Sequence, residues 1–330
     1  MDMPKKIKTS YIINIIGLLL LFALSCVLFE TGIFGTRTDY FKGIATTACY
    51  TIIMVTSLNL LVGIMGEFSL GHAGFMSVGA YASAILTNAL AENGGIPDFL
   101  LFVLALFVGG IAAAITGVLV GIPTLKLRGD YLAIVTVAFA EIIRVAFTNF
   151  EITGGGRTMS GITKLSNFYW VFWVTVICVT IMYMFIRSRF GRTVKAIRED
   201  YIAASASGVN VTFYKVMTFA VSAFFAGIAG AIYAHYMTAM IPTSFNFMYS
   251  AEFLTEVIIG GTGSMTGSII GAAFLSALPE MMRAFAKYRM LGYSVVLVLI
   301  MIFRPGGIFG TWEFSLTRAL SRLTGKKEGK

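Results

Sequence analysis

Charged residues are scarce in this sequence, and their scarcity already excludes several classes of protein. Only 12% of the 330 residues are Asp, Glu, Lys or Arg, while 57% are hydrophobic and the mean hydropathy is +0.84. A soluble domain carries about 25% charged residues, which help to cover its surface. A soluble enzyme, a disordered protein and a nucleic-acid-binding domain are therefore poor descriptions, and we expect an integral membrane protein.

Cysteine and the common catalytic motifs are also nearly absent. The cysteines Cys26, Cys49 and Cys178 each lie singly within an apolar stretch, without a CxxC or Cys/His cluster. This spacing predicts neither a metal site nor a disulfide framework. The sequence lacks a Ser/His/Asp set and a Walker motif, and no Gly-Lys-Ser/Thr follows the glycines at 154–156. We therefore expect no catalytic residue, cofactor or metal, and no enzymatic activity.

Long apolar runs are abundant instead. A helix needs roughly 20 predominantly apolar residues to cross a bilayer core. The candidate runs lie at 11–30, 43–65, 72–91, 99–122, 131–150, 168–187 and 214–240, with a shorter one at 290–303 and a glycine-broken region at 251–282. The sequence predicts an all-α polytopic bundle of about 8–10 transmembrane helices, some broken by glycine. We expect one transmembrane domain over 11–310, between an N-terminus at 1–10 and a basic tail at 311–330.

The basic residues that give the net charge of +9 follow this topology. If residues 1–10 are cytoplasmic and the chain alternates, 17 of the 25 basic residues fall on the cytoplasmic side and seven on the other, with Arg144 within a span. Cytoplasmic loops of membrane proteins carry such an excess of Lys and Arg. The distribution predicts two cytoplasmic termini, provided that 251–282 returns to the side where it began.

Two glycine-rich segments interrupt the apolar pattern, one at 63–74 and one at 260–267. Glycine weakens a helix by about 1 kcal/mol relative to alanine, so each cluster favours unwinding. Paired glycine-interrupted segments in the two halves of a transporter point to its translocation path. The alternative is close helix packing, for which small residues such as Gly117 and Gly227 are also suited. The candidate path residues are Gly63, Gly66, Ser69, Gly71, Gly260, Gly261, Gly263 and Ser264.

The longest loop on the predicted cytoplasmic side, about 188–213, contains an amphipathic helix near 192–208. Helical spacing puts an apolar stripe on one face, made by Val194, Ile197, Tyr201 and Ala204. Gly208 can supply the left-handed residue that ends this helix. We expect the stripe to be buried against lipid headgroups or a partner, and the small residues at 203–207 favour a partner's groove over lipid.

A few ionisable residues lie within the apolar runs. Glu141 and Arg144 are three residues apart and can pair on one helix face, which lowers the cost of burying both. His72 and His235 are expected to be packing residues. A proton- or sodium-driven secondary transporter is the competing class, with candidate path acids at Glu67, Glu141, Glu252 and Glu256.

Several stretches together resemble the LivM-type permease subunit of branched-chain amino acid ABC importers. They lie at 59–73, 127–136, 153–155 and 191–209, followed by the second glycine cluster and by 303–307, so that the resemblance covers most of 40–310. Glu67 departs from the pattern, because many relatives carry a neutral polar residue there. The resemblance therefore leaves urea and other amino acids open as substrates.

The resemblance implies a multi-pass protein of the inner (plasma) membrane of a bacterium or archaeon. It implies a second, LivH-type permease, two cytoplasmic ATPase subunits that bind ATP and Mg, and a periplasmic or lipid-anchored binding protein, in contact with membrane lipid and without nucleic acid. The segment that resembles the ATPase-docking element includes Arg192, Val194, Ile197, Arg198, Tyr201, Ala203, Ala204 and Gly208.

Overall fold

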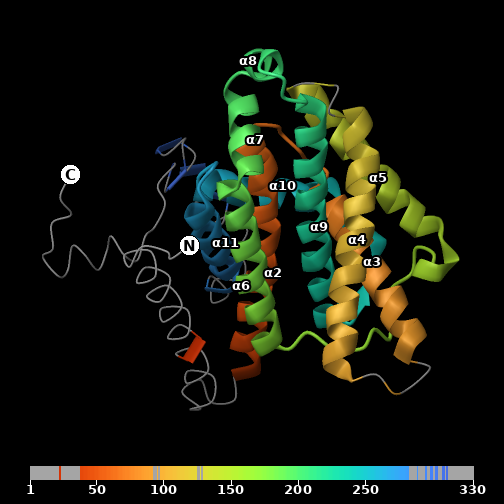
Figure 1. The fold of residues 1–330 in the computed structure, drawn as a ribbon. Coiled ribbons are helices and arrows are strands. Elements are labelled where there is room, and N and C mark those ends of the chain that lie inside the picture. Colours follow the sequence, from red (N-terminus) through yellow and green to blue (C-terminus); the bar gives the residue numbers. More distant parts are fainter. Residues whose placement is uncertain are drawn as a thin grey trace, which may run out of the picture.

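The computed structural model describes residues 38–91, 97–124 and 129–281, together with single residues outside these ranges. The predicted spans 11–30 and 290–303 and the terminal segments 1–10 and 311–330 lie outside the described ranges. Six described helices are long and apolar enough to cross a membrane. The chain is therefore a multi-pass helical membrane protein, as predicted (Figure 1).

The long helices match the predicted spans to within a few residues. They are α2 (Thr38–Asn59), which continues as the π-helix η2 (Leu60–Met65), α3 (His72–Ala91), α4 (Asp98–Thr124), α5 (Asp130–Asn149), α6 (Phe168–Arg187) and α9 (Val211–Met237). Two short helices, α7 (Arg189–Glu199) and α8 (Tyr201–Ala206), lie at one end of the bundle, at the top of Figure 1. We call this end the α7 end.

The predicted broken region is two short helices, α10 (Phe247–Gly260) and α11 (Met265–Met281), joined by residues 261–264. Their 14 and 17 residues are fewer than the roughly 20 that cross a bilayer. The two helices pack against each other and against α2. The remaining elements are the single turns η3 (Glu151–Thr153) and η4 (Pro242–Ser244) and an antiparallel pair of two-residue strands, β1 (Met159–Ser160) and β2 (Ala239–Met240).

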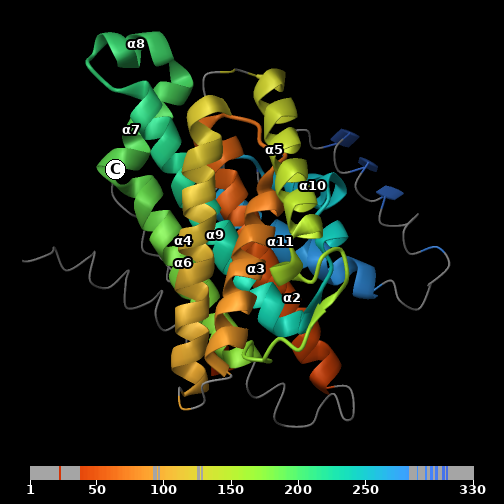
Figure 2. The ribbon, with the colours of Figure 1, turned by 90° about the vertical axis from the view of Figure 1, so that its right-hand side faces the viewer.

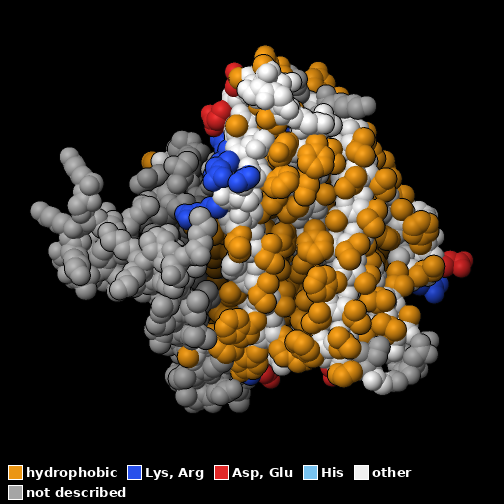
Figure 3. All heavy atoms as spheres, viewed as in Figure 1, with side chains coloured by type: hydrophobic (Ala, Val, Ile, Leu, Met, Phe, Trp, Pro, Cys, Tyr) orange, Lys and Arg blue, Asp and Glu red, His pale blue; other side chains and the backbone are white. Residues whose placement is uncertain are grey.

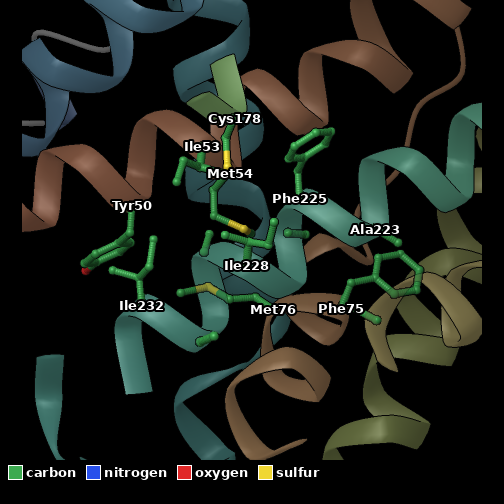
Figure 4. Packing of buried hydrophobic residues seen from close by; sticks show 14 of the residues in the cluster. Tyr50, Ile53, Met54, Phe75, Met76, Cys178, Ala223, Phe225, Ile228 and Ile232 are labelled. Carbon is green, nitrogen blue, oxygen red and sulfur yellow. The ribbon is translucent and has the colours of Figure 1, made fainter. Parts of the chain in front are cut away.

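The core lies around α2, which is the most buried of the long helices. Of the most apolar stretch of α2 and η2, 89% is buried, and Ile53 and Met54 have no exposed surface. Met76 of α3 and Phe225 and Ile228 of α9 pack around them (Figure 4). A central helix that is apolar on all sides is the expected consequence of burial within a larger bundle.

Helices α3, α4 and α9 approach one another backbone to backbone. A Cβ added at Gly109 of α4 would lie 2.8 Å from the carbonyl oxygen of Gly79 in α3, and one added at Gly79 would collide with the backbone of Gly227 in α9. A Cβ at Gly117 would lie 2.5 Å from Cβ of Ala223. The predicted packing role of these small residues is confirmed.

Candidate functional site

The two glycine-rich segments each contain a true break in the helical backbone. Residues 66–71 are non-helical between η2 and α3, and residues 261–264 separate α10 from α11. Gly66, Gly261 and Gly263 adopt φ values of +78°, +120° and +90°, which are conformations that favour glycine. Gly63 differs from the expectation, because it lies within η2 and the first break begins only at Gly66.

The structure brings these two breaks into contact through Asn59. Its side-chain oxygen accepts a hydrogen bond from the N–H of Gly263 at 2.9 Å, and its amide donates to the carbonyl of Ser264 at 3.1 Å. A Cβ added at Gly63 would lie 2.7 Å from Cα of Gly263. Asn59 is fully buried and was not among the predicted site residues, although a polar residue within an apolar run was a signal that could have found it.

Close packing accounts for part of the glycine content, as the alternative interpretation expected. A Cβ at Gly260 would lie 2.5 Å from the carbonyl oxygen of Gly267, where α10 meets α11. A Cβ at Gly71 would lie 2.5 Å from the carbonyl oxygen of Thr136 in α5. Ser69 is buried, and its hydroxyl has no hydrogen-bond partner among the described residues. Close contacts therefore account for Gly71, Gly260 and Gly267, and left-handed backbone accounts for Gly66, Gly261 and Gly263.

The predicted amphipathic helix is two helices rather than one. Asp200 adopts an extended conformation, which ends α7, and its carboxylate accepts hydrogen bonds from the N–H groups of Ile202 and Ala203 at 2.9 and 3.0 Å. Such N-capping by aspartate favours a new helix start over continuation of the preceding helix. Gly208 ends α8 with φ +84°, so this part of the prediction is confirmed.

The predicted apolar stripe is only partly correct. Val194 and Ile197 are 2% and 3% exposed and Ala204 is buried, but Tyr201 is 39% exposed and does not belong to the buried set. Because α7 packs against η2, α6 and α9, Val194 and Ile197 are buried within this chain and not against lipid headgroups or a partner. The surface left open at the α7 end includes Ala203 and Arg192.

Arg198 connects α7 to the first glycine-rich segment. Its guanidinium donates a hydrogen bond to the carbonyl oxygen of Gly63, and a Cβ added at Gly66 would lie 2.9 Å from its Cγ. Gly63 in turn contacts Gly263 in the second break. The two groups of predicted site residues, the loop helix and the breaks, therefore form one continuous cluster.

A pocket of about 940 Å³ opens beside this cluster at the α7 end. Its lining includes Gly66, Glu67, Arg198, Tyr201 and Lys215. Glu67 and Lys215 form an ion pair whose side chains are only 12% and 14% exposed. Glu67, an acidic candidate for a proton path, is therefore neutralised by a lysine from α9.

The other ionisable residues are distributed through the bundle. Nε2 of His72 is 2.8 Å from the hydroxyl of Ser57 and Nδ1 of His235 is 2.9 Å from the carbonyl oxygen of Thr163, as expected of packing residues. The predicted pair of Glu141 and Arg144 is confirmed at 2.6 Å. Glu256 is 3% exposed, and one of its carboxylate oxygens has no partner among the described residues. Within the described ranges, no three His, Cys, Asp or Glu residues gather into a possible metal site.

Comparisons with known proteins give the family. Residues 40–304 match the model of the branched-chain amino acid transport system / permease component. The chain is 36% identical over 300 residues to the high-affinity branched-chain amino acid transport system permease protein LivM of Salmonella typhimurium. The alignment covers 80% of this chain and 69% of that protein.

Two further relatives are more distant. LivH of the same organism is 25% identical over 83% of this chain and 95% of its own length, and the ribose import permease protein RbsC of Haemophilus influenzae is 25% identical over 76% and 83%. No solved structure matches the chain. With both the family model and LivM covering four fifths of its residues, the chain belongs to the branched-chain amino acid transport system permease component family.

Proposed function

We propose that this chain is the LivM-type permease subunit of an ATP-driven importer for leucine, isoleucine and valine. The higher identity to LivM than to LivH supports this assignment within the permease pair. In this proposal the chain lies in the plasma membrane of a bacterium or archaeon and forms half of the translocation path with a LivH-type partner. A binding protein delivers the amino acid on the outer side.

The α7 end is the cytoplasmic end in this proposal, and it docks an ATPase subunit. Arg187, Arg189, Arg192, Lys195 and Arg198 all lie on this stretch of chain, in accordance with the positive charge of cytoplasmic loops. The loop at 188–213 belongs to a permease domain spanning 11–310, flanked by cytoplasmic segments at 1–10 and 311–330. ATP and Mg bind to the partner ATPase subunits, since this sequence has no Walker motif.

The observation that carries the coupling role is the hydrogen bond from Arg198 to Gly63. A push on α7 by a docked subunit changes the position of Arg198, and the bond passes that displacement to the π-helical turn and to the break at 261–264 behind it. Hydrogen bonds are directional and short, so a displacement of about 1 Å is enough to break or drag this contact. Nucleotide-driven movement thereby reaches the two segments proposed to flank the path.

Reconstitution tests the proposal. The chain, a LivH-type permease, two ATPase subunits and the binding protein are placed in liposomes, and uptake of labelled leucine is measured with and without internal or external ATP. We expect uptake that needs ATP at the face bearing α7, with competition by isoleucine and valine but not by urea or ribose.

The second candidate, a secondary transporter, draws support from Glu256, a buried carboxyl group with an unpartnered oxygen. It predicts uptake by this chain without ATPase subunits when a proton or sodium gradient is applied. Gradient-driven uptake in the absence of ATP would overturn the proposed function, and competition by urea would change the substrate class while leaving the ATP-driven mechanism.

A further inference from the structure

Three helices at the periphery of the bundle expose much of their surface, but they differ in what they expose. The outer face of α4 carries Ile111, Ile115 and Leu119, and that of α6 carries Ile177, Ile181 and Met184. Between their ends, neither helix contains a charged residue. Figure 3 shows hydrophobic side chains covering this side of the molecule, as expected of a surface that faces lipid tails.

The least covered of the three is α5, which lies on the outside of the bundle (Figure 2). Only 17% of its most apolar stretch is buried, against 39% for α4 and 28% for α6. Its exposed positions follow helical spacing along one side and include Tyr131, Ile134, Ile142 and Val145. We call this side the α5 face.

An ion pair lies beside the centre of the α5 face. The side chains of Glu141 and Arg144 are 35% and 26% exposed. Glu141 is 11 residues from the start of α5, which corresponds to about 16 Å along a helix that crosses a bilayer core of about 30 Å. The pair is therefore close to the middle of the membrane.

The contacts of this pair are incomplete within the described chain. Nε of Arg144 donates to one carboxylate oxygen of Glu141 at 2.6 Å. Within the described ranges, the remaining guanidinium N–H groups and the other carboxylate oxygen have no hydrogen-bond partner. Lipid tails can accept or donate no hydrogen bond, so a charged pair in this state is costly beside lipid. Protein or polar surroundings must complete it.

The inner side of α5 connects this face to the candidate path. The hydroxyl of Thr136 accepts a hydrogen bond from the N–H of Leu70 at 3.2 Å. The backbone carbonyl oxygen of Thr136 contacts Gly71. Leu70 and Gly71 both belong to the first break. A second permease subunit seated on the α5 face would therefore lie one helix away from that break.

From this arrangement we infer that the α5 face is the contact surface for the second permease subunit, and that polar groups of that subunit complete the Glu141–Arg144 pair. The inference rests on the proposed function, which supplies the second permease. It assigns the partner to α5 and leaves the outer faces of α4 and α6 to lipid.

Site-specific photo-cross-linking in the assembled complex tests the assignment. Benzoylphenylalanine replaces Ile134 or Ile142 on α5, which are 64% and 61% exposed, and in matched controls it replaces Ile115 of α4 or Ile177 of α6, which are 56% and 54% exposed. We expect adducts with the second permease from both α5 positions and lipid adducts alone from the controls. Lipid adducts alone from α5, adducts with a second copy of this chain, or partner adducts from only α4 or α6 would overturn the inference.

A second variant tests the ion pair itself. The double substitution Glu141→Leu with Arg144→Leu removes both charges at once. If the pair faces the second permease, recovery of that subunit with the tagged chain falls severalfold while the amount of chain in the membrane is unchanged. If the pair faces lipid, the double variant recovers as much partner as the unmodified chain, which would overturn the inference. Leucine uptake measured on the unmodified complex separates this outcome from failure of the proposed function.

Discussion

Asn59 and Gly263 are joined by a hydrogen bond of 2.9 Å across 204 residues of sequence. The same side chain donates to the carbonyl of Ser264, so that one buried amide satisfies two backbone groups of the second break. Backbone groups at a helix break have lost their intrahelical partners and need replacements where water is absent. Asn59 therefore allows an irregular segment to persist inside the bundle.

Replacing Asn59 by leucine should destabilise the permease, since each backbone group left unpaired and buried costs about 1–3 kcal/mol. We expect a lower thermal unfolding midpoint of the purified permease pair, together with loss of uptake. Asn88 of α3 is half-buried and its side chain makes no hydrogen bond within the described residues, so Asn88→Leu is the matched control. Equal midpoints for the two variants would contradict the bridging role.

Substitution of Arg198 by alanine should uncouple ATP hydrolysis from transport. A hydrogen bond to a charged group contributes about 1.5–3 kcal/mol, which corresponds to about tenfold or more in an equilibrium. Loss of this hydrogen bond should therefore lower the amount of leucine transported per ATP hydrolysed about tenfold or more, while ATPase activity persists. Lys195→Ala changes an exposed basic residue of the same helix that makes no hydrogen bond to either break within the described residues, and it should keep the ratio. An unchanged ratio in the Arg198 variant would remove this contact from the coupling route.

A methyl group at Gly63 should impair assembly as well as transport. It would collide with the side chain of Asn59 and with the backbone of Gly263. Gly161→Ala is the informative control, because Gly161 has a left-handed conformation but open space around its Cβ position and lies outside the proposed docking element. We expect that control to cost only about 1 kcal/mol of backbone strain and the Gly63→Ala variant to lose most of the recovered complex. Similar recovery of both would indicate a flexible contact at Gly63.

The ion pair of Glu67 and Lys215 should be measurable by a double-mutant cycle. Glu67→Gln and Lys215→Met each leave a poorly exposed charge without its partner. The sum of the two single losses in unfolding free energy should therefore exceed the loss in the double variant. Coupling energies of contacting residues are about 0.5–3 kcal/mol, and we expect a value in that range from thermal unfolding. Additive effects would mean that the pair contributes nothing to stability.

A bulky charge at Ala203 should release the ATPase subunits without disturbing insertion. Ala203 is exposed on α8, in the proposed docking surface, whereas the exposed Ala239 of β2 lies far from α7 and α8 along the helix α9. With Ala203→Glu we expect severalfold less ATPase subunit to be purified with the permease, and with Ala239→Glu no change. Normal recovery and normal coupling with the Ala203 variant would move the docking surface elsewhere.

The helical spans were predictable because membrane thickness imposes both their length and their composition. Span 168–187 matches α6 at both ends, since aromatic and aliphatic residues fill it and Arg187 closes it. The interruption at Asp200 was less visible, because helical periodicity in Val194, Ile197 and Tyr201 continues through it. An aspartate can cap a new helix or be a surface residue of a continuous one, and local pattern does not decide between these.

Contacts between distant segments were the least predictable part of the site. The pairing of Glu67 with Lys215 and the bridge from Asn59 to Gly263 depend on how α2, α9 and the α10–α11 pair meet. Both glycine-rich segments were found from composition alone. Their mutual contact, and the fact that Gly63 is helical while Gly66 is not, follow from tertiary packing and not from glycine content.

The backbone contacts among α3, α4 and α9 limit which parts of the protein can move. Around Gly79, Gly109 and Gly227 the helices meet through backbone and the methyl groups of Ala113 and Ala231, none of which can change rotamer to accommodate sliding. Close-packed interiors of this kind transmit strain instead of absorbing it. These three helices therefore act as a stationary frame. Within the described residues, movement is therefore expected at elements that pack less closely against this frame, such as α5, α7 or the α10–α11 pair.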